Sequence, residues 1–95
     1  MPGYRAGLPP RVAEAIRHLP PEIKRAVRAA IRALTANPHE GEPLHGDLEG
    51  QFKYRVRRYR IVYRIRRAER TLRILAVGER RTIYEEAAAL LRREE

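Results

Sequence analysis

The sequence contains no cysteine, and this absence excludes disulfide bonds, thiolate metal sites and a cysteine nucleophile together. It also has no apolar run close to the roughly 20 residues that a membrane-spanning helix needs. Its first ten residues, MPGYRAGLPP, lack the apolar core of a secretory signal peptide. We therefore expect a cytoplasmic protein that does not contact a membrane and that is stabilised by packing and hydrogen bonds.

Histidines are few, and none lies in a ligand-like cluster. His18, His39 and His45 lack the spacing of metal ligands. Each is expected to be a surface or capping residue. We accordingly predict no metal, no other cofactor and no small-molecule ligand.

Acidic residues are outnumbered, with 12 of them against 21 basic residues and a formal net charge of +9. The imbalance is concentrated in residues 51–81, which hold twelve basic and two acidic residues. A positive field with such a definite location is expected for a protein with a polyanionic partner. The 95 residues suffice for one modest core, so residues 1–95 are interpreted as a single domain.

Two helices are predicted in the N-terminal part. The tripeptide LPP occurs twice, at 8–10 and 19–21, and each copy places proline in the first turn of a helical pattern. Apolar residues of the second pattern repeat at helical spacing, and Asn37-Pro38 ends it. The pattern indicates a helical hairpin whose apolar side needs a sheet to cover it.

The remaining segments predict a sheet and a last helix. Residues 39–50 are polar and are interpreted as a connector, whereas strands are predicted at 51–56, 59–66 and 71–77, with a short further candidate near 4–6. Thr82 and Glu85 form a capping box that begins a C-terminal helix. The expected fold class is α+β in the order (β)ααβββα, with the helical hairpin packed on a small antiparallel sheet.

The segment FKYRVRRYRIVYRIRR, residues 52–67, predicts a β-hairpin with a two-residue turn at Arg57-Arg58. Arginine tolerates poorly the positive φ that such a turn favours. In this register one face is apolar and aromatic: Phe52, Tyr54, Val56, Tyr59, Ile61, Tyr63 and Ile65. The other face carries basic residues: Lys53, Arg55, Arg60, Arg64 and Arg66.

Like charges that face each other across a sheet are destabilising, and Arg55 is expected to lie opposite Arg60. Such a surface is either a solvated face or a binding site for an anion. Arg80 and Arg81 follow the third predicted strand, and Tyr84 lies at the start of the last helix. Cations beside an aromatic ring are typical of sites for single-stranded nucleic acid, so this arrangement favours the anion site.

Three segments, in order, resemble the RelE/ParE toxin superfamily, and more closely its RelE-like mRNA interferase branch. LPPEIKRAVRAAIRALTANP is similar to the second helix of the family, PLHGDLEGQFKYRVRRYRIVYRI to its sheet core, and ILAVGERRTIYEEA to its ending. The resemblance implies the RelE-like fold and the toxin of a type II toxin-antitoxin system. It implies a metal-independent endoribonuclease that cleaves mRNA in the ribosomal A site. The expected partners are a cognate antitoxin, the ribosome and mRNA.

The resemblance also implies site residues. Five positions match the catalytic set of the family: Lys53, Arg55, Arg60, Arg80 and Tyr84. Three further arginines are expected to bind RNA: Arg64, Arg66 and Arg81. Many members have histidine where this chain has Glu79, so a histidine-assisted reaction is not expected here.

The simplest reaction is attack of a 2′-hydroxyl on the adjacent phosphate. Arg60 and Arg80 are expected to stabilise the developing charge. Lys53 is the preferred base, because the neighbouring cations favour its neutral amine. Tyr84 is expected to stack on a base or to donate a proton to the leaving oxygen. Two carboxylates are reserve bases: Glu49 and Glu79.

Two other functions remain open. A ParE-like toxin of the same fold would inhibit DNA gyrase, although such proteins generally lack the full set of basic residues and tyrosine. A basic RNA-binding module without catalysis is the third alternative.

Overall fold

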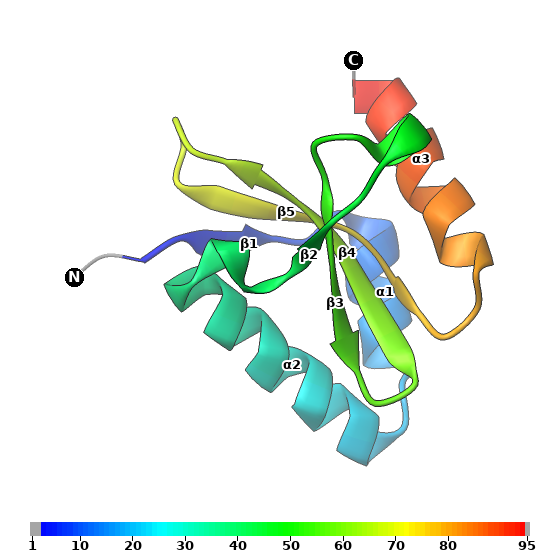
Figure 1. The fold of residues 1–95 in the computed structure, drawn as a ribbon. Coiled ribbons are helices and arrows are strands. Elements are labelled where there is room, and N and C mark those ends of the chain that lie inside the picture. The colour runs from blue at the N-terminus through cyan, green and yellow to red at the C-terminus, as the bar shows by residue number, and fades with distance from the viewer. Residues whose placement is uncertain (1–2, 95) are drawn as a thin grey trace.

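The structure is a computed structural model that describes residues 3–94, and it is drawn in Figure 1. Its elements are β1 (Arg5–Gly7), α1 (Pro10–Arg17), α2 (Pro21–Ala36), the 3₁₀ turn η1 (Pro38–Glu40), β2 (Glu42–Pro43), the 3₁₀ turn η2 (Gly46–Leu48), β3 (Phe52–Val56), β4 (Tyr59–Arg66), β5 (Thr71–Gly78) and α3 (Thr82–Glu94). Among these residues, no helix combines the length and the apolar character that crossing a membrane requires.

Five strands form one sheet in the order β1-β5-β4-β3-β2. The α+β class and the order (β)ααβββα are confirmed, and the short strand near residues 4–6 exists as β1. The sheet is not purely antiparallel, however, because β1 runs parallel to β5. The prediction that residues 39–50 form only a connector was incomplete, because this segment contains β2, which pairs antiparallel with β3. Parallel neighbours need a long connection, and most of the chain lies between β1 and β5.

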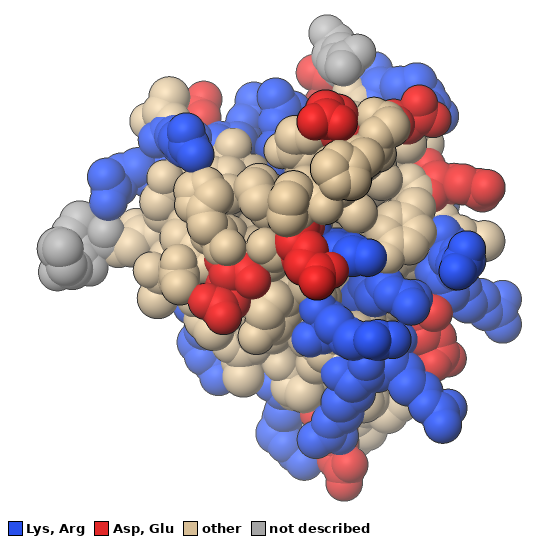
Figure 2. Space-filling model, viewed as in Figure 1, with Lys and Arg blue, Asp and Glu red and all other residues tan. Residues whose placement is uncertain are grey.

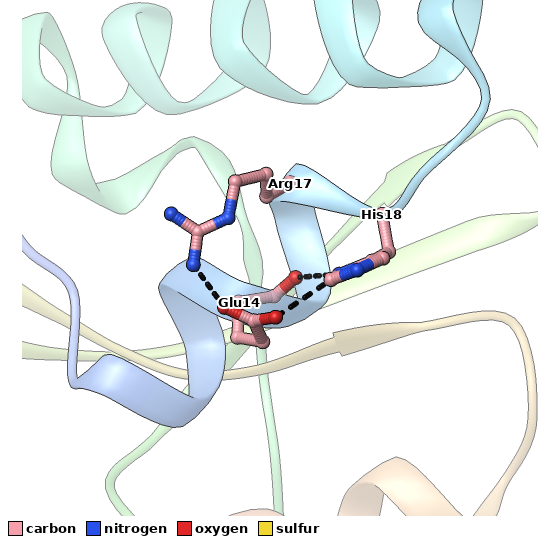
Figure 3. Close-up of polar contacts among 3 residues, drawn as sticks. All are labelled: Glu14, Arg17 and His18. Carbon is pink, nitrogen blue, oxygen red and sulfur yellow. Dashed lines mark hydrogen bonds and ion pairs between the residues drawn. The ribbon is translucent and has the colours of Figure 1, made fainter.

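The two N-terminal helices begin where the LPP motifs predict, at Pro10 and Pro21. Figure 3 shows the C-terminal end of α1, where Glu14 contacts Arg17 and His18. His18 Nδ1 lies 3.0 Å from the carbonyl oxygen of Glu14, so its capping role is confirmed. The hydrogen bond from Arg17, and then its charge, lower the pKa of the Glu14 carboxyl.

The predicted hairpin register is confirmed. Val56 lies opposite Tyr59 and Arg55 opposite Arg60, so the turn consists of Arg57 and Arg58. Arg57 has a φ of 57°, whereas Arg58 is not among the residues with positive φ. These signs match a type II′ turn, in which the first position normally holds glycine. The chain therefore forms the turn with a residue that is strained there.

Helices α1 and α2 cover one face of the sheet and enclose the larger core. From the sheet, Ile61, Tyr63, Leu72 and Ile74 are fully buried against the apolar stripes of these helices. Phe52, Tyr54 and Ile65 pack at the margin of this core. The apolar face that the hairpin pattern predicts is thus the face under the helices.

The opposite face carries the predicted basic residues, but a second apolar core interrupts it. Val62 lies on this face, opposite Lys53, and is fully buried in a second core under α3. Val62 pairs with Ala76 and Tyr63 with Ile74, so the sheet register shifts by one residue at Leu75. This shift places Leu75 and Ala76 in the same core. Helix α3 lies apart from α2 in Figure 1. The buried Val62 separates Lys53 and Arg60 from Arg64, which lines a different depression.

We expect Arg57→Gly to raise the free energy of unfolding by about 1 kcal/mol, because a non-glycine residue at positive φ costs roughly 1–2 kcal/mol. The ion pair that this change removes, with Glu22 at 3.8 Å, is exposed and contributes little. Urea unfolding measures the effect. Arg58→Gly is the matched control and should lower stability, so an equal loss in both variants would contradict the strained turn.

Candidate anion-binding site

Two adjoining depressions lie beside β2, β3 and β4. One, of about 360 Å³, is lined by Glu40, Gly41, Glu42, Lys53, Tyr54, Arg55 and Arg60. The other, of about 280 Å³, is lined by Lys53, Arg60, Arg81 and Tyr84. Because Lys53 and Arg60 belong to both linings, we treat the two depressions as one site and call it the basic groove. Figure 2 shows lysine and arginine side chains gathered over the hairpin, with acidic side chains beside them.

The side chains of Arg55 and Arg60 face each other across the hairpin. Arg60 is half-buried and Arg55 is exposed. Within residues 3–94, neither forms an ion pair with an acidic side chain. Directly opposed like charges destabilise a sheet, so an anion bound between them would relieve the repulsion.

Lys53 has an acidic neighbour that the sequence reasoning did not find. It lies opposite Glu42 of β2, and its Nζ is 3.8 Å from Glu42 Oε1. The surroundings of Lys53 are therefore not purely cationic, and the reason for preferring it as a base does not hold. Its place in the groove suits an ammonium group that contacts phosphate. Glu42 was missed because a strand of two residues leaves no periodic pattern in the sequence.

The start of α3 brings an arginine and a tyrosine to the groove. Tyr84 is half-buried at the edge of the second core, and its amide donates to the carbonyl oxygen of Arg81 at 3.0 Å. Gly78, opposite Arg60, permits a close approach, since a β-carbon there would lie 2.6 Å from the Ile83 side chain. Arg81 lines the groove with Tyr84, whereas Arg80 is exposed and belongs to neither lining. The structure thus brings together Lys53, Arg55, Arg60, Arg81 and Tyr84.

Arg64 and Arg66 lie outside the groove, beyond the buried Val62. Arg64 lines a separate depression of about 300 Å³ whose acidic members are Asp47 and Glu49. Arg66 is exposed, and its Nε lies 3.8 Å from Glu69 Oε1. Both arginines therefore belong to a surface where acidic neighbours offset the positive charge.

The reserve bases also lie elsewhere. Glu49 lines the depression around Arg64, and Glu79 is exposed and lines neither part of the groove. Among the described residues there is no group of three or more His, Cys, Asp or Glu that could hold a metal ion. The carboxylates within the groove are those of Glu40 and Glu42.

A family model matches most of the chain. Residues 8–88 match the model described as the ParE-like toxin of a type II bacterial toxin-antitoxin system. No curated protein sequence matches the chain significantly.

Solved structures of three organisms are similar to the fold. The toxin-antitoxin complex RelBE2 from Mycobacterium tuberculosis has a chain with 32% identity and a TM-score of 0.75, and the match covers 82% of this chain and 99% of that one. A mutant of the E. coli toxin RelE in its free state has 20% identity and a TM-score of 0.80, with 94% and 98% covered. The YoeB/ParE toxin from Agrobacterium tumefaciens has 20% identity and a TM-score of 0.68, with 77% and 94% covered. At 20% identity, the last two likenesses concern the fold alone.

We expect Arg60→Gln to weaken binding of a single-stranded oligonucleotide and to reduce the slope of log affinity against log salt by about 0.7, the value for one phosphate contact. Fluorescence anisotropy at several salt concentrations measures both effects. Arg66→Gln removes the same charge outside the groove and should leave the slope nearly unchanged. An equal change in both variants would place the interface outside the groove.

Proposed function

The chain belongs to the ParE-like toxin family of type II bacterial toxin-antitoxin systems, and from this premise we propose that it is an endoribonuclease that cleaves mRNA in the ribosomal A site. One observation carries the proposal, namely the gathering of Lys53, Arg60, Arg81 and Tyr84 around a single depression. Three cations and a half-buried aromatic ring suit a single-stranded nucleic acid, with charge on phosphate and the ring on a base.

The proposed reaction begins with attack of a 2′-oxygen on the adjacent phosphorus. The 2′-hydroxyl loses its proton, the bond from phosphorus to the 5′-oxygen breaks, and that oxygen takes up a proton. The products are a 2′,3′-cyclic phosphate and a free 5′-hydroxyl. The protein must therefore stabilise negative charge on the phosphate, accept one proton and donate another.

Arg60 and Arg81 are the charge-stabilising groups in this proposal, because guanidinium groups contact phosphate oxygens in a bidentate manner. Glu42 is the preferred proton acceptor. The other groove carboxylate, Glu40, accepts a hydrogen bond from Asn37 Nδ2 at 2.8 Å, whereas Glu42 faces Lys53. Tyr84 has the hydroxyl that can protonate the leaving oxygen.

A cognate antitoxin is the expected protein partner. The similar chain from M. tuberculosis belongs to a toxin-antitoxin complex. We propose that an acidic segment of the antitoxin of this protein contacts the groove, because Arg55 and Arg60 have no acidic partner of their own among the described residues.

Inhibition of DNA gyrase is the second candidate, and the description of the matching family as ParE-like favours it. This activity would need no RNA chemistry. A supercoiling assay with purified gyrase, run beside a translation assay, separates the two functions.

We expect primer extension on a message translated in a cell-free reaction to show codon-phased cuts when the wild-type protein is present. Arg81→Gln should reduce the cleavage rate by about 10²-fold, the loss typical of one oxyanion-stabilising donor. Arg80→Gln is the matched control on the neighbouring residue and should lose less. Inhibited supercoiling with an intact message would contradict the proposed function and support the alternative.

A further inference from the structure

Tyr63 has a buried hydroxyl that holds a neighbouring segment of the chain. The residue is fully buried on β4, and its ring stacks on Phe52 with a centroid separation of 5.6 Å. Its hydroxyl donates to the carbonyl oxygen of Pro38 at 2.6 Å and accepts a hydrogen bond from the amide of Gly41 at 3.1 Å. One side chain of the sheet thus fixes both ends of residues 38–41.

Gly41 is held so closely that no side chain fits there. An added β-carbon would lie 2.5 Å from the Tyr63 hydroxyl oxygen and 2.6 Å from the carbonyl oxygen of Lys53. The φ of Gly41 is −78°, so the glycine is required by space and not by its backbone conformation. The segment therefore lies directly against β3, beside Lys53.

Glu42 follows Gly41 and has few contacts of its own. Its side chain is 79% exposed, and its carboxylate meets one cation, Lys53, at 3.8 Å. The strand β2 that carries it has only two residues. Other contacts of this segment run from His39 to Phe52 and from Asn37 to Glu40, before Glu42. After Glu42, Pro43 pairs with Phe52, and the amide of Leu44 donates to the carbonyl oxygen of Gln51 at 2.8 Å. The backbone of Glu42 is thus held from both sides, and on its N-terminal side the hold is the contact of Gly41 with Tyr63.

We propose that Tyr63 is a positioning residue for the basic groove. Its hydroxyl fixes Gly41 and thereby sets Glu42 opposite Lys53, although Tyr63 lies in the core on the opposite side of the sheet from α3. The proposal rests on the proposed function only where it concerns the rate of RNA cleavage, because the position of Glu42 can be measured separately.

The buried hydroxyl predicts a response to alkaline conditions. Burial is the main cause of the raised pKa of Tyr63. Its stabilising contribution is therefore complete below the ordinary tyrosine pKa of about 10 and is lost as pH rises through the higher value in the folded protein. We expect wild type to lose more stability than Tyr63→Phe in this range. Equal losses in thermal unfolding would contradict a buried, neutral hydroxyl.

Lysine methylation gives a test that needs no cleavage. The chain has two lysines, Lys24 on α2 and Lys53 in the groove, so ¹³C-dimethylation yields two assignable lysine signals in an NMR spectrum. We expect Tyr63→Phe to shift the Lys53 signal toward its position in Glu42→Gln and to leave the Lys24 signal in place. Tyr59→Phe makes the same chemical change elsewhere on β4 and should shift neither signal. An unchanged Lys53 signal in Tyr63→Phe would overturn the proposal.

Cleavage kinetics supply the second readout. We expect Tyr63→Phe to lower kcat on the order of tenfold with little change in KM, since misplacing a reacting group by about 1 Å can cost more than that. In the Glu42→Gln background, the same change should have less than about a twofold effect, because the two residues act together. Full additivity in the double variant, with folding intact, would overturn the proposal.

We call the hold of the Tyr63 hydroxyl on Gly41 the clamp. The NMR and kinetic readouts test the clamp and the proposed function separately. A shifted Lys53 signal in a protein that cleaves no RNA would support the clamp and overturn the ribonuclease proposal. Cleavage by wild type that Tyr63→Phe leaves unchanged would support the ribonuclease and overturn the clamp. Gly41→Ala is the second variant if Tyr63→Phe does not fold, and it should shift the Lys53 signal in the same direction.

Discussion

The structure depends on burying both faces of β4 and β5. Ile61 and Tyr63 face the helices α1 and α2, while Val62, between them in sequence, is fully buried under α3. A strand that is apolar on both faces needs two covering layers. Helix α3 must therefore return across the sheet, and its first turn and the residue before it bring Tyr84 and Arg81 to Lys53 and Arg60. The groove is a consequence of this second core.

The same packing explains how the sheet tolerates its charge. Opposed arginines in a strand pair cost about 0.2–1 kcal/mol, which is small beside the burial of several large side chains. Some cations outside the groove have an acidic partner, as Arg66 has Glu69 and Arg73 has Glu94. Arg55 and Arg60 have none within residues 3–94, so unbalanced charge remains where the chain also places an aromatic ring.

The sequence predicted the features that a local period or turn determines. The hairpin register followed from alternation and a two-residue turn, and both helix starts followed from proline. The parallel pairing of β1, the two-residue strand β2 and the shift at Leu75 depend on distant partners, so no local pattern revealed them. Glu42 was missed for the same reason, and so was the position of Arg80 outside both linings of the groove, because each is set by packing rather than by spacing.

In the proposed function, the basic groove directs attack by a ribose 2′-oxygen. The most direct measurement uses a message that carries one 2′-deoxynucleotide immediately before the cleaved bond, translated in a cell-free reaction with the purified protein. We expect cleavage to disappear at that bond, while bonds at unmodified codons are cut as before and leave 2′,3′-cyclic phosphate ends. Cleavage at the modified bond at the usual rate would contradict the proposed reaction.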